Sequence, residues 1–364
     1  MERSAERGST TWSGHRGRGA ADNPGNRFLP IAVERDDWTL AEDPAPETKL
    51  LRDSSRSILA TNDSPDVGFD VSLNPYRGCE HGCAYCYARP TREYLGMSAG
   101  LDFESKILVK EDAADLLREE LLKPGWTPQP IAFSGVTDAY QPVERRLGVT
   151  RACLEVLAEF RNPALIVTKS HLVTRDIDLL EELAGHRAAA VRISVTTLDR
   201  ELARKLEPRA VTPERRLDAI RKLADAGIPT GVLVGPVIPG LTDHELPAIL
   251  EAAADAGART ASFIMLRLPH GVKDLFADWL ERHRPDRKDR VLGRIREIRS
   301  GSLNDPSFGS RMRGEGPYAE HVRSMFRVSA RRHGLDRRAE PLSAEAFRRP
   351  APGGQGDLFG SIPT

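Results

Sequence analysis

Short apolar runs alternate with amphipathic stretches along most of the chain, starting near Val67. Six of these runs are rich in Val, Ile or Phe, which is typical of buried parallel strands. They occupy residues 67–73, 130–136, 164–170, 190–197, 230–238 and 259–268. We therefore expect six parallel strands with helices between them.

Helix signals separate the runs. Thr212 followed by Pro213 predicts an N-cap with proline in the first helical turn. Thr242 with Glu245 three residues later predicts a capping box. Five apolar residues at helical spacing predict one buried helix face, which makes the cysteine among them a small core residue. These five are Val149, Cys153, Val156, Leu157 and Phe160.

Six strand–helix repeats predict an α/β fold, a partial (β/α)6 barrel with its functional groups at the C-terminal ends of the strands. This main domain covers residues 61–270. Residues 1–60 have little periodicity, which predicts a flexible start followed by an irregular extension packed on the domain. After Pro269 the pattern turns helical and basic, so we expect a helical C-terminal region over residues 271–348 and a disordered tail over residues 349–364.

The net charge of zero conceals an asymmetry. Residues 282–349 hold 18 Lys and Arg against 9 Asp and Glu, so this segment carries +9 and the rest of the chain −9. A basic segment suits phosphate contacts, which makes DNA or RNA a candidate partner. An arginine-rich surface that only meets solvent explains the same counts.

Nothing in the pattern points to a membrane or to secretion. No apolar run approaches the roughly 18 to 20 residues that span a bilayer, and the first 28 residues have no stretch typical of a signal peptide. The number and spacing of the four cysteines are not typical of the disulfide framework of a secreted protein. We expect a cytoplasmic protein with no membrane partner.

Three of the four cysteines lie within eight positions, Cys79, Cys83 and Cys86, just after the first predicted strand. Thiolates this close together in a reducing compartment bind metal or react. A structural zinc ion wants four protein ligands, and His81, between two of the cysteines, reaches the same ion only with difficulty. Three ligands are what an iron–sulfur cube needs when one iron stays open for chemistry. A loop at the C-terminal end of a strand therefore favours a catalytic cluster.

The motif formed by Cys79, Cys83, Tyr85 and Cys86 resembles the signature of radical SAM enzymes, and the resemblance covers roughly residues 67–268. It implies a partial (β/α)6 radical SAM barrel in which the three cysteines hold a [4Fe–4S] cluster. The fourth iron would chelate the amino and carboxylate groups of S-adenosylmethionine. One electron, from a donor such as flavodoxin or ferredoxin, would cleave S-adenosylmethionine to a 5′-deoxyadenosyl radical that abstracts hydrogen from the substrate.

Further strings resemble the spore photoproduct lyase-like branch, also described as DNA-repair-photolyase-like. These are YCYA, TKS at 168–170 and RIS at 192–194, while TDAYQPVE, LEPR, NPYRGC and DPSFGSRMRGEGPYA resemble an uncharacterised bacterial subgroup. The branch implies repair or modification of nucleic acid. Spore photoproduct lyases use a cysteine hydrogen donor just before the Asp of the second-strand loop, but the stretch here, FSGVTDAY, has none. Repair of a thymine dimer by that route is therefore not expected.

The resemblance assigns cofactor-binding roles to residues near the strand ends. Lys169 would neutralise the methionyl carboxylate, Ser194 and Thr196 would bond the ribose hydroxyls, and the backbone of Tyr85 would meet the adenine. The other expected cofactor-binding residues are Ser134, Gly135 and Thr137 at the methionyl amine, Gly231 and Gly235 where backbone approaches the cofactor, and Glu207 and Arg209 within LEPR.

Four residues are candidates for the catalytic or substrate side. Asp138, Tyr140 and Glu144 follow the second predicted strand, and Tyr87 stands beside Cys86, where a phenol could relay hydrogen. Five of the six tyrosines fall between residues 76 and 140, around the cysteines. Aromatic packing, and carboxylates that are solvated or cap helices, remain the alternatives.

The sequence of the C-terminal tail predicts one further partner, the sliding clamp. Gln355–Phe359, QGDLF, resembles the short peptide by which bacterial repair and replication proteins bind the sliding clamp, with Gly356 in the place of the usual leucine. Three hypotheses follow for the whole chain: a radical SAM enzyme acting on nucleic acid, a radical SAM enzyme acting on a protein or small molecule, and a non-catalytic zinc-containing nucleic-acid-binding protein.

Overall fold

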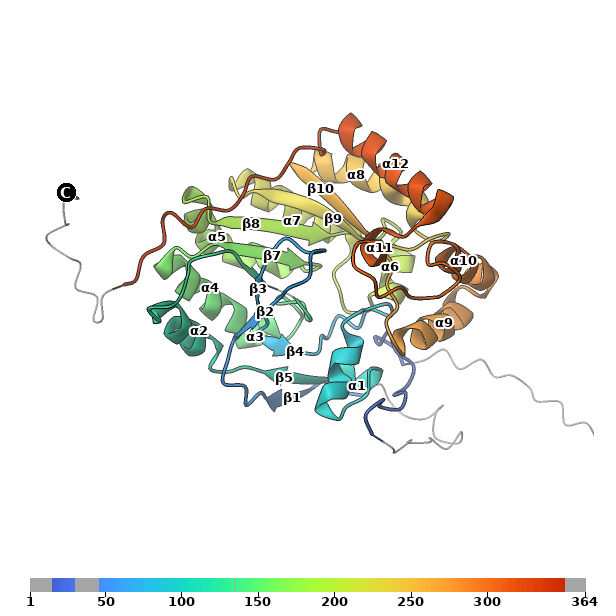
Figure 1. Cartoon of the computed structure of the whole chain (residues 1–364), viewed down its shortest axis with the longest axis horizontal. Coiled ribbons are helices and arrows are strands. Elements are labelled where there is room, and N and C mark those ends of the chain that lie inside the picture. The colour runs from blue at the N-terminus through green and yellow to red at the C-terminus, as the bar shows by residue number, and fades with distance from the viewer. Residues whose placement is uncertain (1–14, 30–45, 134, 351–364) are drawn as a thin grey trace, which may run out of the picture.

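The computed structural model describes residues 15–29, 46–133 and 135–350, and its centre is one open seven-stranded sheet (Figure 1). The strands lie in the order β10-β9-β8-β7-β6-β3-β2. All neighbours from β3 to β10 are parallel, and only β2 runs antiparallel to β3. Their bounds are β2 Leu59–Thr61, β3 Val71–Leu73, β6 Ile131–Phe133, β7 Ala164–Thr168, β8 Ala189–Ser194, β9 Thr230–Val237 and β10 Thr260–Met265. The six predicted parallel strands are confirmed.

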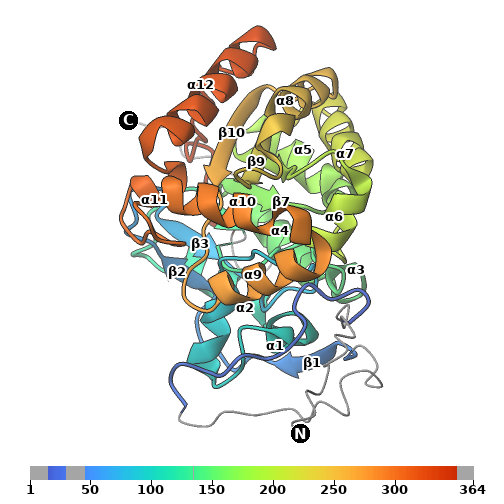
Figure 2. The ribbon, with the colours of Figure 1, turned by 90° about the vertical axis from the view of Figure 1, so that its right-hand side faces the viewer.

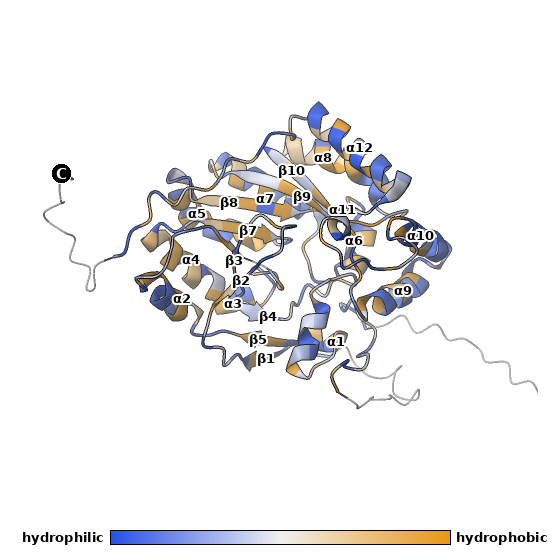
Figure 3. Ribbon diagram, viewed as in Figure 1, coloured by the Kyte–Doolittle hydropathy of each residue, from blue (hydrophilic) through white to orange (hydrophobic). Residues whose placement is uncertain are grey.

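Helices connect these strands and pack on the sheet, where α5 and α7 contact β8 and α8 contacts β9. Strands β7, β8 and β9 are largely apolar, whereas the helices show one apolar and one polar side (Figure 3). The connecting elements are α2 Ala113–Leu122, α3 Glu144–Leu147, α4 Val149–Phe160, η2 His171–Asp176, α5 Ile177–Gly185, α6 Arg200–Leu206, α7 Pro213–Asp225, η3 Asp243–Glu245 and α8 Leu246–Asp255.

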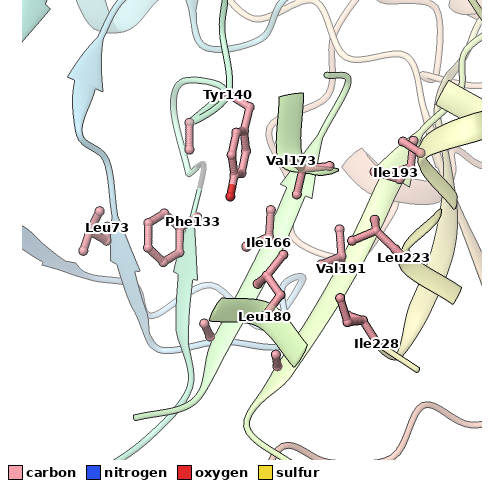
Figure 4. Packing of buried hydrophobic residues seen from close by; sticks show 14 of the residues in the cluster. Leu73, Phe133, Tyr140, Ile166, Val173, Leu180, Val191, Ile193, Leu223 and Ile228 are labelled. Carbon is pink, nitrogen blue, oxygen red and sulfur yellow. The ribbon is translucent and has the colours of Figure 1, made fainter. Parts of the chain in front are cut away.

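The core between sheet and helices is built as the periodicity predicts. Figure 4 shows Leu73, Phe133, Ile166, Val191 and Ile193 from successive strands packed with side chains from the helices. All five predicted apolar positions of α4 are buried, with Cys153 fully buried among them. The prediction that Cys153 is a core residue is confirmed.

Of the two predicted helix starts, one is confirmed, and at the other the predicted capping box does not form. Thr212 is the N-cap of α7, with Pro213 in the first turn. Thr242 and Glu245 do not form a capping box, because each bonds to another element. The Thr242 hydroxyl accepts from the Ile238 amide at 3.0 Å, and the Glu245 carboxylate accepts from Thr197 and from the Leu198 amide.

One strand of the N-terminal extension, β1, belongs to a small sheet whose other strands follow β3. This second sheet has the order β1-β5-β4 and comprises β1 Lys49–Arg52, β5 Lys106–Val109 and β4 Tyr76–Arg77, accompanied by η1 Arg89–Leu95 and α1 Leu101–Ser105. Residues 15–23 pack closely on the chain around the cysteines, with Arg18, Ala20 and Ala21 buried. The backbone of this stretch bonds to Glu104 of the main domain.

The C-terminal region is helical, as expected, with α9 Val272–His283, α10 Pro285–Glu297, α11 Ser310–Arg313 and α12 Gly316–Arg332. Its helices divide between two places: α12 packs on α8, whereas α9 and α10 lie across the end of the sheet (Figure 2). The predicted clamp-binding peptide Gln355–Phe359 lies outside the described residues. Within the described residues no helix is long and apolar enough to cross a membrane.

Candidate active site

The three clustered cysteines lie in the loop between β4 and η1, at the C-terminal edge of the sheet. All three are free thiols, with Cys79 and Cys83 buried and Cys86 partly buried. Backbone hydrogen bonds hold the loop to distant elements, from the Cys79 amide to the Phe103 carbonyl at 3.0 Å and from the Ala84 amide to the Leu206 carbonyl at 2.9 Å. The loop therefore has a defined shape even though it belongs to no helix or strand.

A buried ion pair supports this loop from within. The guanidinium of Arg89 donates to the carbonyls of Cys83 and Gly82, and it pairs with Glu104 at 3.1 Å. Glu104 also accepts from the backbone amides of Gly19 and Ala20 at 2.9 and 2.8 Å. The N-terminal stretch is thereby joined to the cysteine loop through one fully buried carboxylate.

Gly19 fits this contact because it has no side chain. A Cβ atom there would stand 1.8 Å from the carbonyl oxygen of Gly82, closer than any side chain permits. Gly82 itself has φ +63°, in the left-handed region that favours glycine. The two backbones can approach only with glycine at Gly19, so residues 15–23 cover the loop directly.

The thiols fit a metal centre. Burial raises the pKa of Cys79, Cys83 and Cys86, and for Cys79 the neighbouring Asp138 carboxylate and the other two sulfurs raise it further. Such thiols give up their protons readily only when a positive metal centre takes their place. Over residues 15–29, 46–133 and 135–350, no three His, Cys, Asp or Glu side chains converge closely enough for a single metal ion.

A second group of predicted residues meets beside this loop, at the ends of β7, β8 and β9. The Lys169 ammonium, following β7, donates to the Ser194 hydroxyl at 2.6 Å and to the Gly235 carbonyl at 2.8 Å. The hydroxyl of Thr196 lies 3.4 Å from the same ammonium and donates to the Gly235 carbonyl at 3.0 Å. Four residues predicted to bind the cofactor therefore form one network.

Glu207 joins this network to the cysteine loop. It is fully buried, lies 3.4 Å from the Lys169 ammonium and forms an ion pair with Arg216. Tyr85, from the cysteine loop, donates its hydroxyl to the same carboxylate. Burial alone would raise the pKa of Glu207, but Arg216 and Lys169 bring it well below its usual range. Burial and the Glu207 charge together raise the pKa of Tyr85, which stays a neutral donor.

The Lys169 ammonium is the accessible cation of this network, since its side chain is 14% exposed whereas that of Arg216 is 1% exposed. A carboxylate arriving at the strand ends would meet an ammonium already oriented by three acceptors. The arrangement therefore fits a ligand with a carboxylate and hydroxyls, as the sequence predicted for Lys169, Ser194 and Thr196.

Thr137 and Arg209 support the cysteine loop instead of facing a ligand. Thr137 donates to the Gly78 carbonyl at 2.6 Å, just before Cys79. Arg209 pairs with the buried Glu80 at 3.0 Å, and its amide donates to the His81 carbonyl. Both predicted cofactor-binding residues thus act on the loop that carries the thiols, and Ser134 lies outside the described residues.

Asp138 has a comparable structural role, which corrects its prediction as a substrate-side residue. It accepts from the Thr168 hydroxyl at 2.6 Å, from the Lys169 amide at 2.8 Å and from the Tyr140 amide at 2.9 Å. Its carboxylate also lies 3.3 Å from Nδ1 of His81 in the cysteine loop. Burial raises the pKa of Asp138, but His81 and these hydrogen bonds outweigh burial and lower it to about 2. Asp138 is therefore an anion that ties the loop to β7.

Glu144 and Tyr140 are also corrected. Glu144 is fully buried and accepts from Tyr76, from Arg175 and from the Thr150 amide at the start of α4. Its acceptor positions are used, and it caps a helix. Tyr140 is fully buried in the core (Figure 4), where burial and neighbouring Asp176 raise its pKa. Neither residue can meet a substrate in this structure.

Gly231 is a further correction. It is the second residue of β9, at the end of the strand opposite to the network, and a Cβ there would stand 2.4 Å from the hydroxyl oxygen of Thr260. Close pairing with β10, and not the approach of a cofactor, explains this glycine.

Tyr87 is the predicted catalytic residue that meets solvent. It follows Cys86 directly, is 47% exposed, and donates its hydroxyl to the Gly135 carbonyl at 2.8 Å. The Arg267 guanidinium lies over its ring, 5.4 Å from the centroid. Gly135 therefore contributes a carbonyl to this phenol in the structure, next to the thiol loop.

Sequence reasoning missed the polar partners inside the site: Arg89, Glu104, His81 and Arg216. A signal exists for Arg216, which stands on the apolar face of α7 in line with Ile220 and Leu223. A charge at such a position indicates a buried ion pair. No local pattern marks the others, because their partners come from elements far away in the chain.

Comparisons with known proteins agree with this site. The family described as "Radical SAM superfamily" matches residues 73–253. An uncharacterized protein of Mycobacterium tuberculosis is 37% identical over 248 residues, 67% of this chain and 72% of that protein. The radical SAM Nalpha-GlyT isomerase of Pseudomonas phage M6 is 31% identical over 177 residues, 48% of this chain and 35% of the isomerase.

Solved structures of spore photoproduct lyase share the fold. One superposes with a TM-score of 0.56 and 17% identity, over 78% of each chain. The lyase complexed with dinucleoside spore photoproduct gives 0.55 and 16%, again over 78% of each chain. With the three-thiol loop and the Lys169 network at the strand ends, these matches decide against a single-zinc protein: the chain belongs to the radical SAM superfamily, whose cofactors are a [4Fe–4S] cluster and S-adenosylmethionine.

Proposed function

We propose that this radical SAM enzyme acts on nucleic acid, in repair or modification of a nucleotide. Cys79, Cys83 and Cys86 would hold the cluster, and Lys169 with Ser194 and Thr196 would hold S-adenosylmethionine. When bound, the reduced cluster and S-adenosylmethionine would supply a 5′-deoxyadenosyl radical, which abstracts a hydrogen atom from the substrate. An electron donor such as flavodoxin or ferredoxin would deliver the reducing electron.

The observation that carries the proposal is a set of exposed arginines with no acidic partner. Several basic residues of the C-terminal region are neutralised, as in Arg282 with Asp278, Lys288 with Glu281 and Arg294 with Glu297. Others are exposed and form no ion pair within the described residues: Arg290, Arg296, Arg313, Arg327, Arg332, Arg337 and Arg338. Unpaired surface cations of this number suit a polyanion.

Two of the basic helices, α9 and α10, pack against the cysteine loop. Leu280 of α9 and Leu292 of α10 share one hydrophobic cluster with Cys83, Ala84 and Tyr85 of the cysteine loop. A polyanion held on these helices would therefore lie near the radical chemistry, as an enzyme acting on nucleic acid requires. The fold shared with a lyase crystallised with a dinucleoside lesion supports the same proposal.

The hydrogen that completes the reaction needs a donor other than a cysteine on the loop after β6. Cys153 is fully buried in the core of α4, which excludes it as a substitute. Tyr87, exposed next to Cys86, is the phenol best placed to relay hydrogen. We include this relay role for Tyr87 in the proposal.

The experiment follows a label from the substrate. Reduced, cluster-loaded enzyme is incubated with S-adenosylmethionine and deuterated oligodeoxynucleotides or oligoribonucleotides, and the 5′-deoxyadenosine formed is analysed by mass spectrometry. Deuterium in 5′-deoxyadenosine from one of these pools is expected. A matched incubation uses deuterated peptides and small metabolites, and label arriving only from those would overturn the proposal in favour of a non-nucleic-acid substrate.

A further inference from the structure

We propose that Arg267 anchors a backbone phosphate of the substrate beside Tyr87. The inference rests on the proposed function, because it takes nucleic acid as the source of the phosphate. It assigns Arg267 a role in binding and specificity, not in the radical chemistry.

Arg267 and Tyr87 lie where two distant parts of the sheet face each other. Arg267 follows β10, and its guanidinium lies 5.4 Å from the centroid of the Tyr87 ring. Tyr87 reaches the opposite side, donating to the carbonyl of Gly135, which follows β6. Because Tyr87 is 47% exposed, a molecule in solvent can reach the phenol and the guanidinium together.

The Arg267 guanidinium is poorly partnered. Its Nε atom is buried and has no hydrogen-bond acceptor. The one hydrogen bond of its side chain goes to the thioether sulfur of Met312 at 3.7 Å, a weak acceptor. No carboxylate within the described residues forms an ion pair with it, and burial and the Arg311 charge lower its pKa. A partly desolvated cation without an anion is costly by itself, and an arriving phosphate would correct this.

The two neighbouring arginines have better acceptors than Arg267. Arg299 donates from its two terminal nitrogens to three backbone carbonyls, those of Leu266, Ser310 and Arg311, although its Nε, like that of Arg267, has no acceptor. Arg311 forms an ion pair with Asp66 and also donates to Ser64. Within the described residues Arg267 is the one of the three whose side chain has no oxygen acceptor, so its terminal nitrogens keep donors for a ligand.

The Asp66–Arg311 pair lies close to Arg267. Asp66 lies in the loop between β2 and β3, at one edge of the sheet, whereas α11, which carries Arg311, contacts β10 at the other edge. The amide of Gly309 adds a second bond to Asp66 at 2.6 Å. This bridge ties the segment around Met312, the one acceptor of the Arg267 side chain, to the far edge of the sheet.

The test compares a ligand that has one backbone phosphate with a ligand that has none. Thymidylyl-thymidine, a dinucleoside monophosphate, and thymidine are titrated against cluster-loaded wild type, Arg267→Gln, Arg267→Lys and the control Arg221→Gln. Arg221 is exposed, forms no ion pair within the described residues and lies on α7, outside the basic C-terminal region. Arg267→Gln should weaken binding of the dinucleotide about tenfold or more and leave the affinity for thymidine unchanged. It should also reduce the salt dependence of oligonucleotide binding by about one phosphate contact.

Arg267→Lys should restore part of the affinity, because it keeps the charge but loses the two-pronged donor. Iron content and S-adenosylmethionine binding, measured on each variant, show that the site is intact. Unchanged dinucleotide affinity in Arg267→Gln, or equal loss in Arg221→Gln, would overturn the anchor and leave the proposed function standing. Absence of binding by wild type to both the dinucleotide and longer DNA or RNA would overturn the proposed function itself.

Discussion

The two sides of the active site are built differently. On the cofactor side, Lys169, Glu207 and Arg216 lie at the ends of adjacent strands and helices, and each is buried or nearly so with several partners. On the side proposed for the substrate, Tyr87 is half exposed, and no carboxylate within the described residues forms an ion pair with Arg267. The comparison teaches that the fold surrounds the buried charges of the first side with partners and leaves donors free on the second.

The cause lies in the elements that carry each side. Parallel strands end at one edge, so the side chains that follow β7, β8 and β9 meet without long loops. Tyr87 instead lies in the cysteine loop and Arg267 follows β10, which pairs only with β9 among the described strands. Tyr87 is half exposed there, so solvent reaches this side.

Removing a thiol ligand breaks the cofactor side entirely. Cys79→Ala, Cys83→Ala or Cys86→Ala should each abolish the [4Fe–4S] cluster, measured by iron and sulfide content and by absorbance near 400 nm after anaerobic purification. Cys153→Ala is the control, because this buried thiol belongs to the core of α4. It should keep the cluster and lose on the order of 1 kcal/mol of stability. A colourless Cys153→Ala protein would contradict the assignment of three ligands.

Removing the central carboxylate should unfold the cofactor side. Glu207→Ala leaves Arg216 and Lys169 charged and buried without their partner, so the free energy of unfolding should fall by about 3 to 5 kcal/mol. Chemical denaturation measures the loss. Glu201→Ala, at an exposed pair with Lys205, is the control and should change little. A small decrease in the free energy of unfolding of Glu207→Ala would mean that water enters the network. The cofactor side would then be less rigid than its contacts suggest.

Removing the accessible ammonium of Lys169 should leave the fold intact and weaken binding of S-adenosylmethionine. Lys169→Ala should reduce S-adenosylmethionine binding by about 1.5 to 3 kcal/mol, the usual contribution of a hydrogen bond to a charged group. Calorimetric titration of cluster-loaded protein measures this change, with Lys222→Ala, on the exposed side of α7, as the control. An unchanged dissociation constant would leave Lys169 as a structural part of the Glu207 network.

The two tyrosines that flank Cys86 give the smallest and most direct comparison. Tyr85→Phe removes a buried donor to Glu207 and should destabilise the fold by about 1 to 3 kcal/mol. Tyr87→Phe removes a half-exposed hydroxyl and should change stability by less than about 0.5 kcal/mol. Thermal unfolding of both variants measures the difference. Equal losses would show that the exposed side is as tightly built as the buried one.

Much of this arrangement is determined by the sequence itself. Alternating apolar runs predict six parallel strands, and parallel strands put the residues after each run at one edge. That is why Lys169, Ser194, Thr196 and Gly235 could be grouped before any coordinates, and why three closely spaced cysteines indicated a metal loop. Local periodicity and short spacing carry this information, because they concern residues that are neighbours in the chain.

The tertiary structure alone decided which polar groups are free. Asp138, Glu144 and Tyr87 all looked like substrate residues, yet the first two are used up by Lys169, Thr150 and other donors from elsewhere in the fold. The packing of residues 15–23 on the cysteine loop, and the lack of an anion at Arg267, were equally invisible. A hydrogen bond or an ion pair depends on where a partner tens or hundreds of residues away is placed. Periodicity reports which face of an element is buried, but not what it meets there.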